Sequence, residues 1–394
     1  MGKVKELDLC LRQERPLFIP PSLFTCESLI LLKLRTNPSI HFPKYMSFPR
    51  LRRLELHHFK LSDECWNEEL FSNSPVLEEL ILERCNVSMS YLCISIPTLK
   101  LLKFNTWNVE GNGLRDCVFK IDAPRLVSLS YSGYVPKEFI FSSFLALVEA
   151  DIHFSSEENG CAEIIRLFRA LAHVKCPTVY DLTLQAIYRV QRQLNNLLTF
   201  HNVKVLNIAE VLTTDQGLIA LLKAVPNLES LAIFEFMGDK EVEENTNDTE
   251  DNGDYDHEHD YADYFQFENN HDNEDVSDAA ECDKNYGNSD DGWAPDIVTT
   301  GCSLLHLKSV CFHEFFGNPR EIRWVKLILR KAKALQTMTI RYNDDSDFHF
   351  LNAKSEKELM VEVPSFPRAS AGSVIKFCSW DWRSVVLCRN KKLE

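Results

Sequence analysis

One spacing of apolar residues recurs along the chain: apolar, any two residues, apolar, any one residue, apolar. The twelve units with this spacing begin at Val4, Leu29, Leu51, Leu77, Leu99, Leu126, Leu147, Val179, Val203, Leu228, Leu307 and Leu335. Successive units begin 21 to 32 residues apart, except for one gap of 79 residues after Leu228. A leucine-rich sequence yields single matches by chance, but twelve at near-constant spacing predict a repeat protein.

The alternating part of each unit predicts a short strand with one buried side. The segments between strands carry helical signals. Ser62 is a good N-cap for a helix over Asp63–Leu70, and apolar residues at helical spacing predict helices around Ile164–Leu171 and Leu218–Val225. A proline stands two residues before several units and is expected to end the return segment and preset an extended entry. These prolines are Pro49, Pro75, Pro97, Pro124 and Pro226.

The unit from Leu77 to Val87 satisfies the leucine-rich-repeat template L-x-x-L-x-L-x-x-N/C-x-L at every fixed position. Other units put bulky residues in the template's Asn or Cys place, so a polar ladder there is expected to be weak. These residues are Phe59, Trp107, Tyr134, Ile187, Val211, Phe236 and Phe315. We therefore predict an α/β fold, a right-handed leucine-rich-repeat solenoid with a parallel sheet on its concave face and helical or irregular returns on its convex face.

Charge divides the chain unevenly. The 394 residues hold 58 Asp and Glu against 43 Lys and Arg, but residues 239–291 alone hold 21 acidic and 2 basic residues. Removing these 53 residues reduces the 79-residue gap to 26, which marks them as an insertion between neighbouring units. The predicted domains are a repeat array over 1–238, an acidic disordered insertion over 239–293, the last repeats together with a distinct C-terminal sequence module over 294–377, and a tail over 378–394.

Targeting signals and cysteine spacing favour the cytoplasm or the nucleus. The chain begins without the apolar core of a secretory signal and shows no apolar stretch long enough to span a bilayer. Its 13 cysteines include no Cys-x-x-Cys pair, so they are interpreted as reduced thiols. No membrane association is expected. Neither the acidic segment nor the near-neutral remainder has the basic balance of a nucleic-acid-binding domain.

The C-terminal third points to a particular family. The run Gly301–Val310, the residues Phe315–Asn318 and the helical stretch up to Ile340 resemble the FBD module of plant F-box proteins. A second block, Pro364–Ser370, resembles the "fPRaS" signature that closes that module, with Val374 and Phe377 after it. The upstream repeats are similar to the leucine-rich region of the same plant F-box/LRR/FBD family.

The resemblance implies a protein-protein interaction module like the substrate-recognition part of a cullin-based (Skp-cullin-F-box) ubiquitin ligase receptor. Family members begin with an F-box, which docks on the ligase adaptor, but here the first repeat begins at Val4 and no F-box is visible. A truncated form and a genuine F-box-less scaffold with no ubiquitin role both fit. The implied partners are a protein ligand on the concave face and, only if an F-box lies upstream, the adaptor.

Catalytic motifs are absent from the sequence, which predicts no enzyme, no cofactor and no metal. It contains no G-x-S-x-G elbow and no phosphate-binding loop. The acidic segment carries a metal-like set at His257, Glu258, His259, Asp260 and His271, which leaves a metal-binding or enzymatic protein as the second alternative. Few apolar residues surround these side chains, so a solvated segment is the preferred interpretation.

The fifth and seventh residues of each unit are expected to face outward from the concave sheet and to bind a protein ligand. Charges of both signs with few aromatic residues favour a protein over an aromatic small molecule. The candidate protein-binding residues are Lys33, Arg35, Glu55, His57, Glu83, Lys103, Asn105, Asp151 and His153.

A basic helix in the C-terminal third could interact with the acidic insertion. Over Pro319–Ala334, a buried face of Ile322, Val325, Leu329 and Ala332 is predicted. The basic residues of the helix, Arg320, Arg323, Lys326, Arg330, Lys331 and Lys333, are expected to lie mostly outward. Our hypothesis is that the insertion folds back on this basic face and screens it.

Deleting residues 239–291 tests that hypothesis. The deletion is expected to change the affinity for a ligand, and the change should diminish as salt is added, because dissolved ions weaken the attraction between opposite charges. Titrations of the intact and the deleted protein at low and high salt measure it. An affinity that does not change at low salt would contradict the hypothesis.

Overall fold

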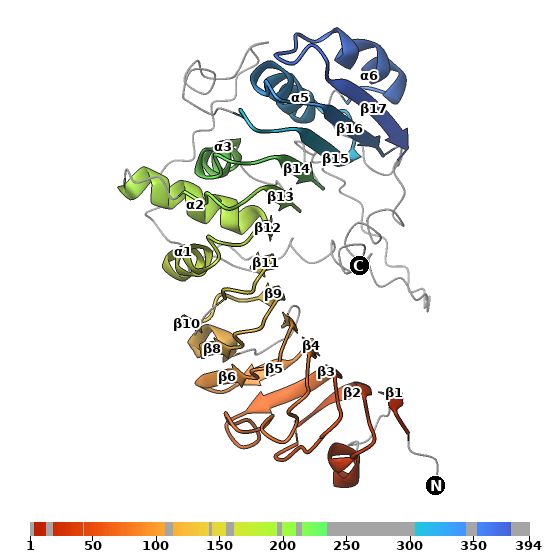
Figure 1. Ribbon diagram of the computed structural model, residues 1–394, viewed down its shortest axis with the longest axis vertical. Coiled ribbons are helices and arrows are strands. Elements are labelled where there is room, and N and C mark those ends of the chain that lie inside the picture. The colour runs from red at the N-terminus through yellow and green to blue at the C-terminus, as the bar shows by residue number, and fades with distance from the viewer. Residues whose placement is uncertain are drawn as a thin grey trace, which may run out of the picture. The chain divides into compact units, whose positions relative to one another are not determined.

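The computed structural model describes residues 4–12, 19–41, 43–106, 113–141, 144–154, 161–194, 199–209, 215–234, 304–343 and 353–379. Within these residues, parallel strands pair one after another in a single large sheet (Figure 1). The strands in this row are β1 (Glu6–Arg12), β2 (Leu31–His41), β3 (Arg53–Ser62), β4 (Glu79–Glu83), β7 (Leu101–Asn105), β9 (Ser128–Gly133), β11 (Glu149–Phe154), β12 (Cys176–Val179), β13 (Val205–Ile208), β14 (Ser230–Ile233), β15 (Ser309–Phe315), β16 (Thr337–Tyr342) and β17 (Val374–Ser379).

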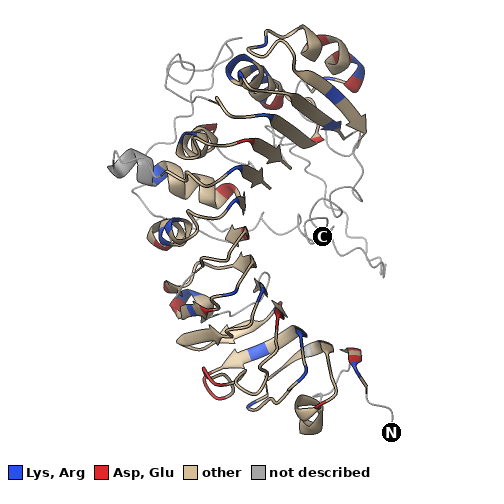
Figure 2. Ribbon diagram, in the orientation of Figure 1, with Lys and Arg blue, Asp and Glu red and all other residues tan. Residues whose placement is uncertain are grey.

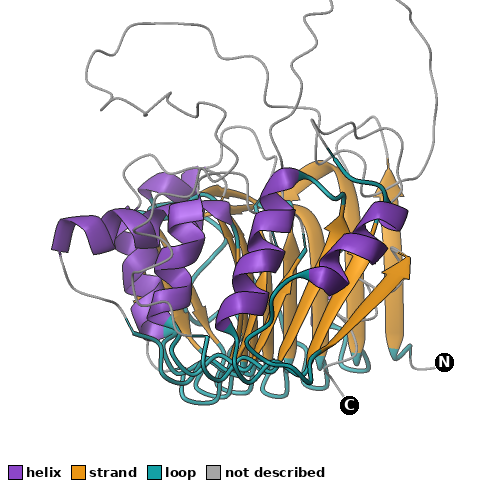
Figure 3. Cartoon of the chain, turned by 90° about the horizontal axis from the view of Figure 1, so that it is seen from above, coloured by secondary structure: helices purple, strands orange, loops and turns teal. Residues whose placement is uncertain are grey.

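The return segments cover one side of this row (Figure 3). Their helices are α1 (Cys161–Ala170), α2 (Asp181–Leu194), α3 (Asp215–Ala224), α5 (Pro319–Lys331) and α6 (Glu356–Glu362), with the short 3-10 helices η1 (Pro21–Thr25), η2 (Gly113–Asp116) and η4 (Val363–Ser365). In the middle of the array the returns are strands instead. The strand β5 (Asn86–Ser88) pairs with β3, and β10 (Glu138–Phe141), β8 (Val118–Asp122) and β6 (Tyr91–Ser95) form a second parallel sheet. The predicted α/β leucine-rich-repeat class is confirmed.

The same turn opens almost every unit. The first apolar residue donates its backbone N–H to the carbonyl three residues earlier, as Leu51 does to Phe48 at 3.3 Å and Leu99 to Ile96 at 3.1 Å. Pro49 and Pro97 therefore occupy the second place of a four-residue turn, where their fixed φ is favourable. The prediction that these prolines preset an extended entry into the strand is wrong, because the chain forms a turn at them before the strand begins.

One predicted unit is out of register. The unit assigned to Val179 begins instead at Val174, whose N–H closes the opening turn with Leu171 at 2.9 Å. The strand is β12, and the residues assigned to the second and third apolar positions, Leu182 and Leu184, lie in α2. Apolar residues at the spacing of one helical turn imitated the strand pattern, and Ile187 consequently does not occupy a template position. With Val174 as the start, the neighbouring intervals become more regular.

The helix predicted over Asp63–Leu70 does not form. The strand β3 extends to Ser62, and the segment after it is a series of turns. The indole N–H of Trp66 donates to the carbonyl of Cys93 at 2.8 Å, so this segment is tied to the edge strand β6. By contrast, the helices predicted around Ile164 and Leu218 are confirmed, and both residues are fully buried.

Buried aromatic rings fill the space between the two sheets. The ring centroids of Phe104 and Phe119 lie 4.9 Å apart, and Tyr131 packs edge-on against Phe139 at 5.5 Å. These residues come from the large sheet (β7 and β9) and the small one (β8 and β10), and each is at most 2% exposed. Burying such rings contributes more than their area alone, since edge-to-face contacts add about 0.5–1.5 kcal/mol per pair.

The strands that flank the predicted insertion are direct neighbours. Leu231 of β14 pairs with Val310 of β15 in continuous register. Hydrogen bonds from Lys308 at 2.6 Å and Lys204 at 2.9 Å lower the pKa of Glu229 to about 2. The predicted acidic insertion itself, over 239–293, lies outside the described residues.

The helices on either side of the same gap are also joined. Asp215, the first residue of α3, accepts hydrogen bonds from Arg320 at 2.8 Å and from the indole of Trp324 at 2.9 Å, both on α5. Arg320 therefore does not face outward as predicted, and its side chain is only 14% exposed. The predicted buried face of Ile322, Val325, Leu329 and Ala332 is confirmed. The helix ends at Lys331, three residues earlier than expected.

The Pro364–Ser370 block fixes the last strand in place. The guanidinium of Arg368 donates to the carbonyls of Pro364 at 2.8 Å and Ser373 at 3.0 Å, which closes the loop before β17. Ser370 donates to the carbonyl of Leu335 at 2.7 Å. Val374 and Phe377 lie on β17, which pairs with β16 and continues to Ser379. The FBD-like region is thus the end of the same sheet.

Leu307→Ala and Leu305→Ala provide a matched test of the repeat. Leu307, at a first apolar position, is fully buried, whereas Leu305 is 48% exposed. We expect Leu307→Ala to lower the free energy of unfolding by about 2–5 kcal/mol. Leu305→Ala should change it by less than about 0.5 kcal/mol. Urea denaturation measures both, and equal losses would contradict the assignment of the unit.

Candidate protein-binding face of the parallel sheet

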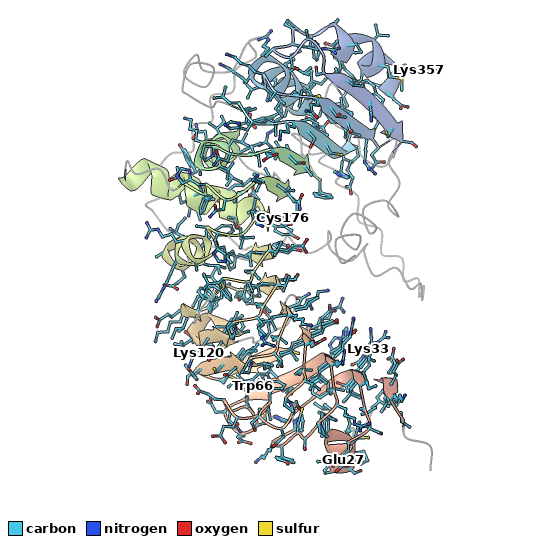
Figure 4. All side chains as sticks on the ribbon, viewed as in Figure 1. Glu27, Lys33, Trp66, Lys120, Cys176 and Lys357 are labelled. Atoms are coloured by element: carbon cyan, nitrogen blue, oxygen red, sulfur yellow. The ribbon has the colours of Figure 1, made fainter. Side chains whose placement is uncertain are left out.

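In each unit of the large sheet, the position of a residue determines on which side of the strand its side chain lies. The fourth and sixth residues point toward the returns and are buried in nearly every unit, as Leu54 and Leu56 are on β3. The third, fifth and seventh residues lie on the other side of the strands, which we call the open face. Figure 4 shows Lys33 and Cys176 on this side, away from the helices α1 and α2.

All nine candidate residues lie on the open face, on strands that pair in one sheet. Lys33 and Arg35 are on β2, Glu55 and His57 on β3, Glu83 on β4, Lys103 and Asn105 on β7, and Asp151 and His153 on β11. Strand pairing aligns the fifth positions as Lys33, Glu55, Ile81 and Lys103. It aligns the seventh positions as Arg35, His57, Glu83 and Asn105. Their role in binding stays a prediction.

Glu55 is the centre of a charged network on the first strands. Its carboxylate forms ion pairs with Lys33 and, at 3.1 Å, with Arg53, and it lies 2.8 Å from Nε2 of His57. Its side chain is only 8% exposed. Burial alone would raise the pKa of Glu55, but the hydrogen bonds from His57, Lys33 and Arg53 outweigh burial and hold the pKa well below its usual range.

Residues of both charges also lie on the neighbouring strands (Figure 2), and some of them extend the network. Nδ1 of His57 lies 3.5 Å from Glu83, which also pairs with Lys103. At the other end, Arg35 pairs with Asp8 of β1 at 3.3 Å. Six of the nine candidate residues are therefore already paired with one another or with neighbouring side chains of the sheet. A ligand that binds there must compete with these existing pairs or add to them.

The remaining candidate residues lie further along the sheet. Asn105 occupies the seventh position on β7, and its carbonyl accepts a hydrogen bond from the N–H of Cys85 at 3.4 Å. Asp151 and His153 are two strands away on β11, on the far side of β9, and are not part of the network around Glu55. The ring of His153 stacks on Tyr180 with centroids 4.0 Å apart and an angle of 3° between the planes.

The open face also carries two groups of residues that were not predicted from the sequence. Arg53 and Glu79, paired at 3.0 Å, occupy third positions, which face outward just as the fifth and seventh positions do. The second group is an aromatic row at seventh positions, formed by Tyr180, Phe234 and His313. Phe234 stacks on His313 with centroids 4.3 Å apart. Starting the β12 unit at Val174 and extending the count beyond β11 would have identified this row.

The described part of the chain contains no group of three or more His, Cys, Asp and Glu side chains arranged to hold a metal ion. The metal-like set at His257–His271 falls outside it. None of the helices described is both long and apolar enough to cross a bilayer.

The basic face of α5 is partly engaged. Besides Arg320, Lys326 lies over the ring of Phe366 at 4.8 Å from its centroid. Arg323, Arg330 and Lys333 are exposed as predicted. The hypothesis that the insertion covers this face stays a prediction, because the insertion is outside the described residues.

Comparisons with known proteins agree with this architecture. The leucine-rich-repeat model described as "FBD-associated F-box protein At5g56370, LRR repeats" matches residues 1–138, and the FBD model matches residues 299–340. The resemblance to plant F-box/LRR/FBD proteins is therefore confirmed, and the chain carries both the repeat region and the FBD region.

Individual relatives come from Arabidopsis thaliana. F-box/FBD/LRR-repeat protein At1g78750 is 31% identical over 55% of this chain and 49% of its own length. F-box/LRR-repeat protein 13 is 30% identical over 55% of this chain and 50% of its own length. The chain spans about half the length of the curated relatives it matches. No solved structure matches the chain.

Glu55→Gln tests whether the network stabilises the fold. Removing the charge leaves Lys33 and Arg53 without their shared carboxylate and should lower the free energy of unfolding at pH 7 by about 1–3 kcal/mol. A depressed pKa in the folded state contributes stability above the unfolded pKa, so the difference from wild type should shrink as the pH falls below about 5. Urea denaturation across that pH range measures it.

Glu78→Gln is the matched control. Glu78 pairs with Lys100 at 2.9 Å outside the open face, and its side chain is 33% exposed. Because exposed ion pairs contribute little, we expect a loss below about 1 kcal/mol. Equal losses for the two variants would show that the network around Glu55 has no special role.

Proposed function

We propose that this chain is the substrate-recognition region of a ubiquitin-ligase receptor and binds a protein on the open face. The observation that carries the proposal is the continuous open face itself, with outward side chains at fixed positions across thirteen paired strands. Its support is the match to F-box/FBD/LRR-repeat proteins.

The open face has the physical properties of a rigid recognition surface. Its strands lie about 4.8 Å apart, so side chains form a lattice whose spacing the backbone fixes. The charged network around Glu55 further restricts Lys33, Arg53 and His57 before any ligand arrives. Restricting these side chains in advance lowers the entropy lost on association.

The chain would act by binding alone. Its described residues supply ion pairs and hydrogen bonds that hold one another, and the proposed mechanism involves no covalent step on them. A protein bound to the open face would have one of its lysines presented to the ligase, provided that an F-box connects the open face to the adaptor. Nine cysteines in the described ranges have free thiols, which supports the cytoplasm or the nucleus as the place of action.

Site-specific photo-crosslinking tests the binding surface. The protein is expressed from its own gene with a photo-crosslinking residue at Lys103 or Asn207 on the open face. The control is Val361 on α6, which is 78% exposed and outside the sheet. We expect one partner to crosslink from the open face and not from Val361. If the partner crosslinked equally well from the open face and from Val361, or not at all from the open face, the open face would not be the binding surface.

The same purification distinguishes a ligase receptor from a scaffold. Co-purification of the adaptor and cullin with the crosslinked partner is expected. Recovery of the partner without either subunit would favour a repeat scaffold with no ubiquitin role, while leaving the binding surface in place.

A further inference from the structure

The two halves of the open face differ in charge. On β2, β3, β4 and β7, seven of the twelve residues at the third, fifth and seventh positions are Asp, Glu, Lys or Arg. On β12, β13, β14 and β15, all twelve corresponding residues are described and none is charged in this sense. We call these twelve positions the uncharged patch. Its fifth positions are Thr178, Asn207, Ala232 and Cys311.

The polar groups of the uncharged patch bond to one another. Asn207 donates to Thr178 at 3.3 Å, and the hydroxyls of Ser230 and Ser309 lie 2.8 Å apart. The aromatic row borders these small side chains. Ten of the twelve residues are partly exposed, while Ala209 and His313 are buried. A partner that covers this patch displaces water from small and aromatic side chains, none of which is Asp, Glu, Lys or Arg.

That difference matters for binding energy. The centres of protein interfaces are depleted in charged residues and enriched in aromatic ones, because burying an unpaired charge costs several kcal/mol. The uncharged patch has this composition, whereas the network around Glu55 does not. The patch is therefore the better place for the buried centre of an interface, and the charged half is better suited to orienting the partner.

Charges of opposite sign flank the uncharged patch. Glu149 and Asp151 lie on β11 at one side, and Arg341 on β16 and Lys376 on β17 lie at the other. A complementary ligand is uncharged in its middle, basic toward β11 and acidic toward β16. Five strand intervals separate β11 from β16, which is about 24 Å, or about seven residues of extended chain.

We propose that the uncharged patch binds an extended segment of a partner protein, with an uncharged middle of about seven residues between a basic and an acidic side chain. The segment crosses the strands with its basic end over β11 and its acidic end over β16. The inference rests on the proposed function and specifies the partner that this same face selects.

Selection of peptides on the full chain tests the inference. Displayed random peptides of about twelve residues, long enough to cover the patch and both flanks, are panned against the purified protein. We expect enriched peptides to have the basic–uncharged–acidic order. A synthetic peptide with the two charged ends exchanged should bind about tenfold more weakly, because each end then faces its own sign. This comparison needs no variant of the protein.

Variants at Ala232 locate the binding site. Ala232 is half-buried at the centre of the patch, so Ala232→Asp and Ala232→Lys should each weaken the enriched peptides about tenfold or more, since either charge must lose water on binding. The matched controls are Val361→Asp and Val361→Lys on α6, where the side chain is 78% exposed and outside the sheet, and these should change affinity less than about twofold. Thermal unfolding checks that each variant is folded.

Several results would overturn the inference. These are the enrichment of no peptide, enriched peptides with charged middles, stronger binding by one Ala232 variant, and equal weakening by the Val361 variants. Self-association that the Ala232 variants abolish would show that a second copy occupies the patch instead. Crosslinking from Lys103 but not from Asn207 would overturn the inference alone, whereas absence of crosslinking from both would overturn the proposed function.

Discussion

The structure depends on one repeated main-chain interaction, the hydrogen bond that passes from each unit to the next at the entrance of the strand. Arg52 donates to Ile30 at 2.8 Å, Glu78 to Arg52 at 2.8 Å and Lys100 to Glu78 at 2.7 Å, and the same bond continues to Gln336 and Lys308 at 2.8 Å. A shift of one residue would turn the buried leucines outward. Because this bond fixes the register, the core, the opening turns and the open face all repeat in step.

Much of the fold could be predicted because each repeat unit has the same characteristic spacing of apolar residues. The sequence predicts eleven of the twelve units at the positions where the strands form, and it places the nine candidate residues on one face. The error at Val179 has a physical cause, since Leu182 and Leu184 are buried in α2 and helix burial also uses leucine. The helix expected after Ser62 does not form. Its N-cap signal involves only neighbouring residues, whereas the hydrogen bond from Trp66 to Cys93 joins residues that are far apart in the sequence.

The candidate site was harder to predict than the fold. Sequence spacing shows which side chains share a face, but not which of them pair. The charges at Lys33, Glu55 and Glu83 look like separate attractions for a ligand until the sheet pairs Lys33 with Glu55 and places Glu83 beside His57. The aromatic row required the correct register on β12 before Tyr180 could be assigned to the open face. The Pro364–Ser370 block was recognisable from the sequence, but its structural role was not. Arg368 in this block donates hydrogen bonds to backbone carbonyls of its own loop.

The direct pairing of β14 with β15, and the bonds from Asp215 to Arg320 and Trp324, have a consequence for how such chains can change over time. The ends of the intervening segment are held by the sheet and by two helices, so its length does not enter the register. Closing a longer loop costs little, since each doubling adds only about 0.6 kcal/mol. This junction is therefore a position where new sequence of almost any length could be accepted, tested by selection and removed again while the rest of the protein keeps its fold.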